Sequence, residues 1–244
     1  MAKVQPGDPL RIAASDWNTL LGVADAARVN ELVFGSGKST FPLYQGVIVP
    51  VKNNTGAVVA RYHAAAIGAP VVPPGDNEQE FLNRLAFIGE DMSASYFGRF
   101  AVFQETTDVN RMGLAMIEGV TVAEITVNNE DHDRVDVDTA GGSKLVSQYY
   151  GAGEILYKES GTGTKLAVIR IGAFVAPQLK AVADEDIAVS GSGDVYIQRN
   201  ATATELVTAH LNWMAGSTGV TDGDQLLIKF YPDENKWGID GAEC

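Results

Sequence analysis

Apolar positions near the start of the chain follow the spacing of an amphipathic helix. Trp17, Leu20, Leu21 and Ala24 fall at i, i+3, i+4 and i+7, so they form one stripe on a helix surface. Ser15 stands before them and is a favoured N-cap residue. A helix this short is marginal in isolation, so we expect it to dock on the protein's own body or on a neighbouring subunit.

Beyond residue 43 the spacing changes to that of β-strands. Residues 43–51 form a β-rich run, residues 53–56 (Asn-Asn-Thr-Gly) predict a turn, and residues 57–62 predict the partner strand. The proline-rich stretch 69–77 predicts a loop. Further strands are expected at 100–104, 113–127, 154–158, 166–171, 187–189, 195–197, 206–213, 225–231 and 236–239.

These elements define the expected fold class. About a dozen short strands separated by turn signals are typical of sandwiches and barrels, and strands do not alternate with helices as in an α/β fold. We therefore predict a mainly β protein: a short N-terminal helix followed by an antiparallel sandwich-like or barrel-like body. The 244 residues allow one large β domain or two smaller ones. The expected division is an arm with its helix at 1–43, a central β domain at 44–176 and a C-terminal β domain at 181–244.

The net charge of the chain disfavours some classes of binding partner. The formal net charge is −13, and no run of basic residues stands out. Nucleic-acid binders need a surplus of Lys and Arg to displace counterions, so we expect neither nucleic-acid binding nor docking on an anionic membrane. Residues 180–244 carry eleven acidic side chains against four basic ones. This imbalance predicts that the C-terminal β domain presents a face to water.

Neither a targeting signal nor a pair of cysteines points to a particular function. The N-terminus lacks the apolar segment of a signal peptide, and no apolar run approaches the ~20 residues of a membrane helix. We expect synthesis in the cytoplasm. Cys244 is the one cysteine of the chain, so no intrachain disulfide can form.

Residues 35–40 (Gly-Ser-Gly-Lys-Ser-Thr) resemble the end of a phosphate-binding loop. That motif needs an earlier glycine where this chain has Leu32, and a following helix where this chain has Pro42. We therefore expect no nucleotide site around Lys38.

The densest group of oxygen ligands is the acidic stretch 128–138. Asp131, Asp133, Asp136 and Asp138 could hold a hard cation such as Ca²⁺ if they converged. The simpler interpretation is a solvated loop beside an edge strand, where charge opposes aggregation. We expect no metal site here, and the cation site is the alternative.

Catalytic signatures are weak. The three histidines, His63, His132 and His210, are far apart in the sequence, and no Gly-x-Ser-x-Gly elbow is present. A Ser-His-acid triad or a carboxylate pair assembled from distant positions stays open. We predict no catalytic residues, no cofactor and no enzymatic activity. Trp213 and Trp237 are expected to be core aromatics, with stacking on sugar rings as the alternative.

Three stretches resemble a group of tailed-phage virion proteins. They are the leader 7–18 (Gly-Asp-Pro-Leu-Arg-Ile-Ala-Ala-Ser-Asp-Trp-Asn), the hairpin 151–170 and the ending 237–244. The resemblance implies a capsid decoration (cement) protein or a head or tail fibre, commonly a homotrimer. Its partners would be the major capsid protein or other virion proteins, and its location the virion.

Two hypotheses follow from this resemblance and the residue pattern. The first is a non-enzymatic decoration protein whose N-terminal arm attaches to the particle through apolar side chains, with 181–244 facing outward. The expected attachment residues are Leu10, Ile12, Trp17, Leu20 and Leu21. The alternative is a receptor-binding fibre whose C-terminal domain binds a surface glycan.

Overall fold

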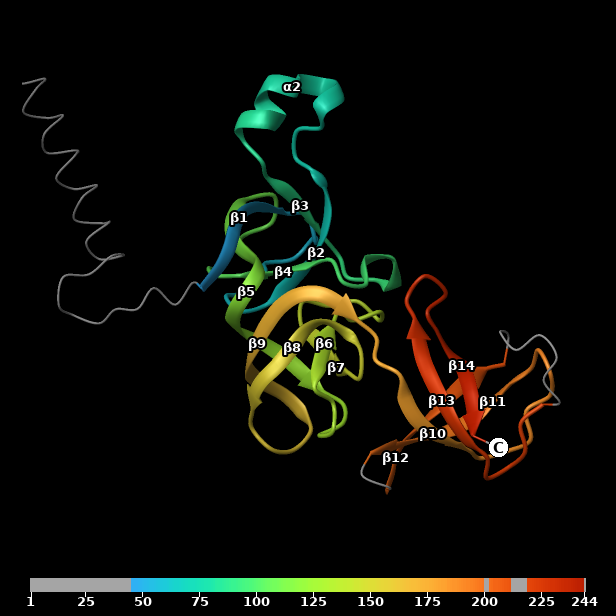
Figure 1. The fold of residues 1–244 in the computed structure, drawn as a ribbon. Helices are drawn as coiled ribbons and strands as arrows, with labels where there is room; N and C mark the ends of the chain where they lie inside the picture. The colour runs from blue at the N-terminus through green and yellow to red at the C-terminus, as the bar shows by residue number, and fades with distance from the viewer. Residues whose placement is uncertain (1–44, 200–201, 212–218, 244) are drawn as a thin grey trace, which may run out of the picture. The chain divides into compact units, whose positions relative to one another are not determined.

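The computed structural model describes residues 45–199, 202–211 and 219–243, and this part of the chain is mainly β, as predicted (Figure 1). The expected N-terminal helix lies outside the described residues. The elements are β1 (Gln45–Asn53), β2 (Ala64–Pro70), α2 (Pro74–Asn83), β3 (Phe87–Glu90), the 3₁₀ turn η1 (Ala94–Tyr96), β4 (Phe100–Phe103), β5 (Met112–Val127), β6 (Arg134–Asp136), β7 (Leu145–Gln148), β8 (Gly151–Lys158), β9 (Gly163–Val175), β10 (Leu179–Ala183), β11 (Ser192–Arg199), β12 (Thr202–His210), β13 (Gln225–Tyr231) and β14 (Lys236–Glu243).

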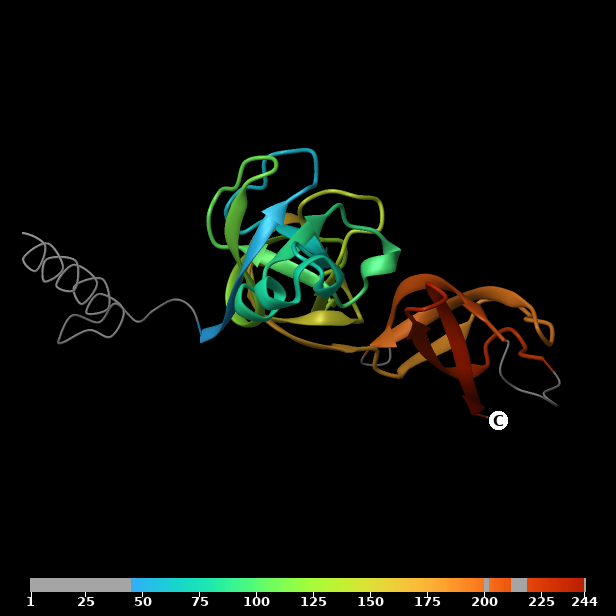
Figure 2. The same cartoon turned by 90° about the horizontal axis from the view of Figure 1, so that it is seen from above.

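The strands close on themselves rather than forming open sheets. The first nine pair in the order β1-β3-β2-β4-β5-β7-β6-β8-β9, and two further pairings join β1 to β5 and β5 to β9. The result is two circuits of five strands that share β5. We name them barrel A (β1–β5) and barrel B (β5–β9). Strands β10–β14 close separately into barrel C, whose orange to red strands wrap around one another in Figure 2.

One pairing scheme occurs in all three barrels. In barrel A, β1 pairs with β3 in parallel, and β3–β2, β2–β4 and β4–β5 are antiparallel. Barrel B repeats this with β5 parallel to β7, followed by the antiparallel pairs β7–β6, β6–β8 and β8–β9. Barrel C repeats it with β12 parallel to β14, followed by β14–β13, β13–β10 and β10–β11. The expected antiparallel body therefore contains three parallel pairings among the described strands.

Barrel C is a circular permutation of barrel A. The strands equivalent to β4 and β5 come first in barrel C, as β10 and β11, and those equivalent to β1–β3 follow. The registers agree residue by residue: Val102 opposite Met116 corresponds to Val182 opposite Tyr196, 80 positions later. Likewise, Ala64 opposite Val102 corresponds to Gln225 opposite Val182. Agreement at this level points to one structural unit used repeatedly.

Each barrel is filled by its own cluster of buried side chains. The core of barrel A includes Val51 and Phe103, and that of barrel C includes Ile197 and Ile228. Strands β2 and β4 are buried on both faces, because Ala65 and Phe103 belong to the core of barrel A while Ala64 and Phe100 belong to the core of barrel B. Burial on both faces explains why these strands are continuously apolar instead of alternating.

Strand β5 supplies both barrels because it is sixteen residues long. Its first half places Ala115 in the core of barrel A, and its second half places Ile125 in the core of barrel B. Gly119 lies between the halves with φ +110°, a conformation that residues with a Cβ rarely adopt. The strand therefore turns from one barrel to the next at a glycine.

Two predicted strands are wrong. Residues 57–62 contribute an isolated bridge between Val59 and Thr107, and Tyr62 turns the chain with φ +70°. Residues 187–189 likewise contribute an isolated bridge between Ile187 and Val220, followed by a turn in which Ser190 has φ +61°. In each case one apolar residue, Val59 or Ile187, is buried, whereas its neighbour Val58 or Val189 is exposed. The apolar run therefore resembled a strand although it forms no ladder of backbone hydrogen bonds.

The predicted loop at 69–77 is wrong in its second half, because α2 begins at Pro74. Proline is compatible with the first turn of a helix, where its missing N–H would have no partner. The run Pro-Pro-Gly-Asp-Asn (residues 73–77) therefore forms the start of a helix. Among the described residues, no helix has the length and apolar character needed to cross a membrane.

Candidate functional site

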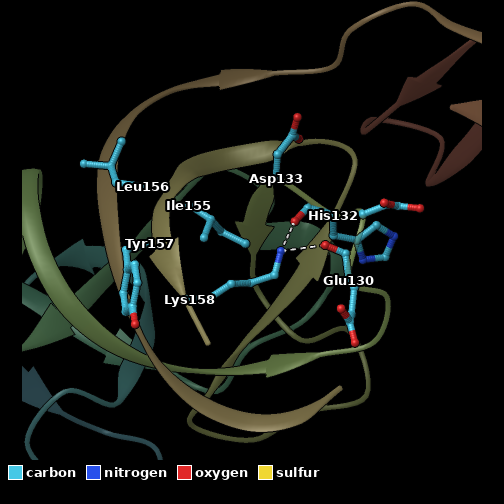
Figure 3. A pocket seen from close by; sticks show the side chains of 8 residues that line it. Glu130, His132, Asp133, Ile155, Leu156, Tyr157 and Lys158 are labelled. Carbon is cyan, nitrogen blue, oxygen red and sulfur yellow. Dashed lines mark hydrogen bonds between the residues drawn. The ribbon is translucent and has the colours of Figure 1, made fainter. Parts of the chain in front are cut away.

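The acidic loop between β5 and β6 lines an open hollow of about 530 Å³ with the outer residues of β8 (Figure 3). Lys158 reaches from β8 to this loop, and its ammonium donates hydrogen bonds to the carbonyl oxygens of Glu130 (2.8 Å) and His132 (2.6 Å). Leu156 and Tyr157 are 46% and 62% exposed. The ammonium thus fixes the loop while the neighbouring apolar side chains face water.

The four aspartates of the suggested cation site do not converge. Asp131 and Asp133 are exposed, whereas Asp136 is fully buried. Asp138 accepts a hydrogen bond from the N–H of Ala140 in its own turn. Within the described ranges, no group of three or more His, Cys, Asp or Glu residues is arranged to hold a metal ion.

Asp136 instead organises the backbone of barrel B. One carboxylate oxygen accepts hydrogen bonds from the N–H groups of Gly98 (2.9 Å) and Val137 (2.8 Å), and the other accepts one from Ala152 (2.9 Å). Burial raises the pKa of the Asp136 carboxyl, and the three backbone donors oppose that rise without cancelling it. The side chain joins the segment before β4 to strands β6 and β8.

His132 links barrel B to barrel C. The residue is 2% exposed, and its Nδ1 lies 2.9 Å from the hydroxyl oxygen of Ser147, itself fully buried. Its Nε2 lies 2.8 Å from a carboxylate oxygen of Glu205 on β12. The amide of Asn129 donates to the same Glu205 oxygen at 3.1 Å. Burial raises the pKa of Glu205, but His132 and Asn129 together outweigh this and hold it below its ordinary value.

Aromatic rings cover the rest of this junction. Tyr150 of the β7–β8 turn stacks on Phe230 of β13, with centroids 3.6 Å apart and planes 2° apart. Trp237 and Phe97 pack edge-on against Phe230 at 5.5 and 5.4 Å. Burial raises the pKa of the Tyr150 phenol far above its ordinary value. Trp237 is thus half-buried between strands as expected, whereas Trp213 lies outside the described residues.

A second histidine stands in a similar set of partners between β2 and β5. His63 Nδ1 lies 2.7 Å from the hydroxyl oxygen of Ser143, and its Nε2 lies 3.6 Å from Glu124. Lys144 binds the same Glu124 carboxylate at 2.6 Å. The hydrogen bond from Lys144 lowers the pKa of Glu124, burial raises it, and the charges of Lys144 and His63 leave the net change downward.

Neither Ser-His-Glu group has the arrangement of a hydrolytic triad. Ser147 has no exposed surface, so a substrate carbonyl cannot reach its hydroxyl. Ser143 is partly exposed, but the 3.6 Å gap between His63 and Glu124 exceeds a hydrogen bond, and Glu124 is engaged by Lys144. Sequence alone left open a triad from distant positions, and these contacts explain His63 and His132 as structural ties.

The hairpin that contains α2 is the main departure of barrel A from its repeats. Residues 71–86 join β2 to β3, whereas the equivalent β13–β14 connection has only residues 232–235. No residue of α2 is buried, and the hairpin projects beyond the strands at the top of Figure 1. Leu82 is 73% exposed and Leu85 is 49% exposed. Barrel closure does not require this insertion, so its exposed apolar residues are the best candidate for a binding surface.

The structure does not test the sequence-predicted attachment residues. Leu10, Ile12, Trp17, Leu20 and Leu21 lie outside the described residues, as do Lys38 and Cys244. Sequence reasoning missed the hairpin surface, because Phe81, Leu82 and Leu85 are too few to give a helical period. A comparison of the chain with itself would have exposed the hairpin as an insertion.

Comparisons with known proteins identified no relative. No family model, no curated protein and no solved structure matches this chain.

Replacing Lys158 with methionine should loosen the acidic loop without unfolding barrel B. The carbonyl groups of Glu130 and His132 would lose a charged donor, which typically costs about 1.5–3 kcal/mol per hydrogen bond before water replaces it. Amide hydrogen exchange should accelerate at residues 128–133. Lys180→Met, which changes an exposed lysine on β10, is the control, and equal exchange rates in the two variants would contradict the prediction.

Proposed function

We propose that this protein is a non-enzymatic structural component of a tailed-phage particle, displayed on the particle surface. In this proposal it decorates or stabilises the capsid as a homotrimer bound to the major capsid protein. The resemblance of its leader, hairpin and ending to phage virion proteins supports the class. Its acidic balance, −13 overall, supports a water-facing position.

The observation that carries the proposal is the hairpin 71–86 on a repeated closed barrel. Helix α2 is interrupted by a non-helical residue at Asn77 and has no buried residue, so it gains little from its own protein and is marginal by its length. Leu82 and Leu85 also expose apolar surface that a partner would cover. An insertion with these properties suits a protein whose role is to bind other proteins of an assembly.

The glycan-binding alternative receives less support. Exposed aromatic side chains are what sugar rings stack on, and Trp237 is packed against Phe230 and Tyr150 instead. The decoration role is therefore preferred to the receptor-binding fibre.

Changing Leu82 and Leu85 to glutamine should remove the protein from particles. Glutamine is well tolerated in helices, where Leu82 lies, and Leu85 follows the helix in an exposed segment, so the fold should be kept. Losing two apolar anchors of about 1.5–3 kcal/mol each should lower occupancy at least tenfold. The measurement is the number of copies per purified particle, by quantitative mass spectrometry, after complementation of a gene deletion.

The matched control is Leu166→Gln, because Leu166 is 57% exposed on β9, outside the hairpin. Normal incorporation of the double variant would show that the hairpin is not part of the attachment surface. Absence of even the wild-type protein from particles would refute the virion role itself.

A further inference from the structure

Two kinds of contact join barrel B to barrel C, and they respond differently to pH. The aromatic stack of Tyr150 on Phe230 carries no charge over the physiological range. The second contact is polar and centres on Glu205, which receives donors from both His132 and Asn129. Any pH dependence of the junction must therefore arise largely from the second contact.

One arrangement of hydrogens satisfies the contacts around His132. The Ser147 oxygen accepts a hydrogen bond from the backbone N–H of Asn128 at 2.9 Å, which leaves its own hydrogen free to be donated to His132 Nδ1. The imidazole then carries its hydrogen on Nε2 and donates it to Glu205. A neutral histidine and an ionised glutamate satisfy every group in this chain of contacts.

We propose that the contact between His132 in the β5–β6 loop and Glu205 on β12 is an acid-sensitive latch that holds barrel C against barrel B. Ionised Glu205 accepts two hydrogen bonds at one oxygen, from side chains of residues 129 and 132. Once protonated, the carboxyl group can no longer accept both equally well. The nearly buried imidazole then faces a weakened acceptor and has little access to water.

Protonation of His132 alone does not open the latch. It creates an ion pair with Glu205 and strengthens that contact, although the new hydrogen on Nδ1 forces the Ser147 hydroxyl to turn. The other ionisable groups at this place are Tyr149, edge-on to His132 at 4.5 Å, Lys158, whose ammonium donates to the His132 carbonyl oxygen, and Tyr150 with Asp136 beyond it. The tyrosines stay neutral in acid, and Asp136 is bound by three backbone donors.

The pH range follows from Glu205. A carboxyl group whose pKa is lower in the folded protein stabilises the fold above its ordinary pKa, and this contribution disappears as pH falls through the lowered value. The latch should hold at neutral pH and fail below about pH 4.5. Apart from Tyr149 of the β7–β8 turn, the core of barrel C consists of its own residues, so we expect a loosened junction before either barrel unfolds.

Trp237 reports on the junction because its ring packs against Tyr150 at 5.7 Å. In the full chain with Trp17→Phe and Trp213→Phe, its fluorescence should shift to the red as the pH falls below the ordinary pKa of a glutamate, while far-ultraviolet circular dichroism stays constant. Glu205→Gln should show the shifted spectrum already at pH 7 and lose the acid step. Glu205→Asp, which is shorter but still ionised, should show a partial shift and serves if the glutamine variant does not fold.

The control is Glu185→Gln, which removes a carboxylate of barrel C that accepts a hydrogen bond from its own barrel, from the N–H of Asp194. This variant should titrate as wild type. An acid step that persists unchanged in Glu205→Gln and Glu205→Asp would overturn the latch. The purified chain suffices for this experiment, so its result is independent of the virion role.

Discussion

Replacing Asp136 with alanine should lower the free energy of unfolding by about 3 kcal/mol or more. Its carboxylate is the acceptor for three backbone N–H groups, those of Gly98, Val137 and Ala152. A buried donor without an acceptor costs about 1–3 kcal/mol, and relief of the buried charge offsets part of the sum. Chemical denaturation monitored by circular dichroism measures the loss.

Replacing Asp136 with asparagine removes the negative charge but keeps one acceptor oxygen. Its single carbonyl oxygen can still accept from Gly98 and Val137, but its amide nitrogen would face the N–H of Ala152, donor against donor. Asp136→Asn should therefore lower the free energy of unfolding, but by less than Asp136→Ala does. Asp138→Ala, which frees only the exposed N–H of Ala140, is the control. Equal stability of Asp136→Ala and Asp138→Ala would contradict this account.

The pH dependence of Asp136 has the opposite sign to that of Glu205. Burial raises the pKa of Asp136, so the native state disfavours its ionised form. Its contribution to stability is fully present below the ordinary pKa of an aspartate and declines as pH rises through the raised value. The stability of wild type relative to Asp136→Asn should therefore fall between acidic and neutral pH.

Long strands with regular alternation could be predicted from the sequence, and short ones could not. Expected strands at 113–127 and 225–231 correspond to β5 (Met112–Val127) and β13 (Gln225–Tyr231) within one residue. Strands β3, β6 and β7 have only three or four residues, too few to show a period of two. Barrel closure supplies their stability, and closure is a property of pairings between distant residues.

The polar sites could not be predicted from the sequence, because they too depend on contacts between distant residues. His132 and Glu205 are 73 positions apart, and His63 and Ser143 are 80 apart, so no local spacing could join them. In the sequence Asp136 groups with its acidic neighbours, but it is buried at the end of β6 whereas Asp131 and Asp133 are exposed in the loop before that strand. Composition identified the acidic stretch correctly but could not show which of its carboxylates is structural.

The sequence also contains an internal repeat that relates barrel A to barrel C. The same amino acids recur 80 positions later, between Val182 and Ile197, at the five positions Val102, Glu105, Val109, Gly113 and Ile117. Both Glu105 and Glu185 accept a hydrogen bond at 2.9 Å from the N–H nine residues ahead. Asn110 and Ser190, 80 positions apart, turn the chain with φ of 60° and 61°. A search for internal repeats would have predicted that barrels A and C are related.

The repeated glycine of this motif leads to the last prediction: Gly113→Ala and Gly193→Ala should each destabilise the protein by about 1–3 kcal/mol, as overpacked cores do. A Cβ at Gly113 would lie 2.0 Å from the Thr107 hydroxyl oxygen, and one at Gly193 would lie 2.6 Å from a side-chain carbon of Ile187. Thr107 and Ile187 are the bridge residues at equivalent ends of the two barrels, and both are buried. Both are β-branched side chains with few alternative rotamers, so neither can easily move aside.

Thermal unfolding of the single and double variants measures this effect. Gly172→Ala is the control, because its Cβ would meet nothing within 4 Å and its backbone is not strained. Thr107→Ala should partly rescue Gly113→Ala, since it removes the two side-chain atoms nearest the new methyl group, and should not rescue Gly193→Ala. If the glycine has the same role in barrels A and C, the two alanine variants will behave alike. Wild-type stability in either would show that the repeated glycine does not serve the close packing inferred for it.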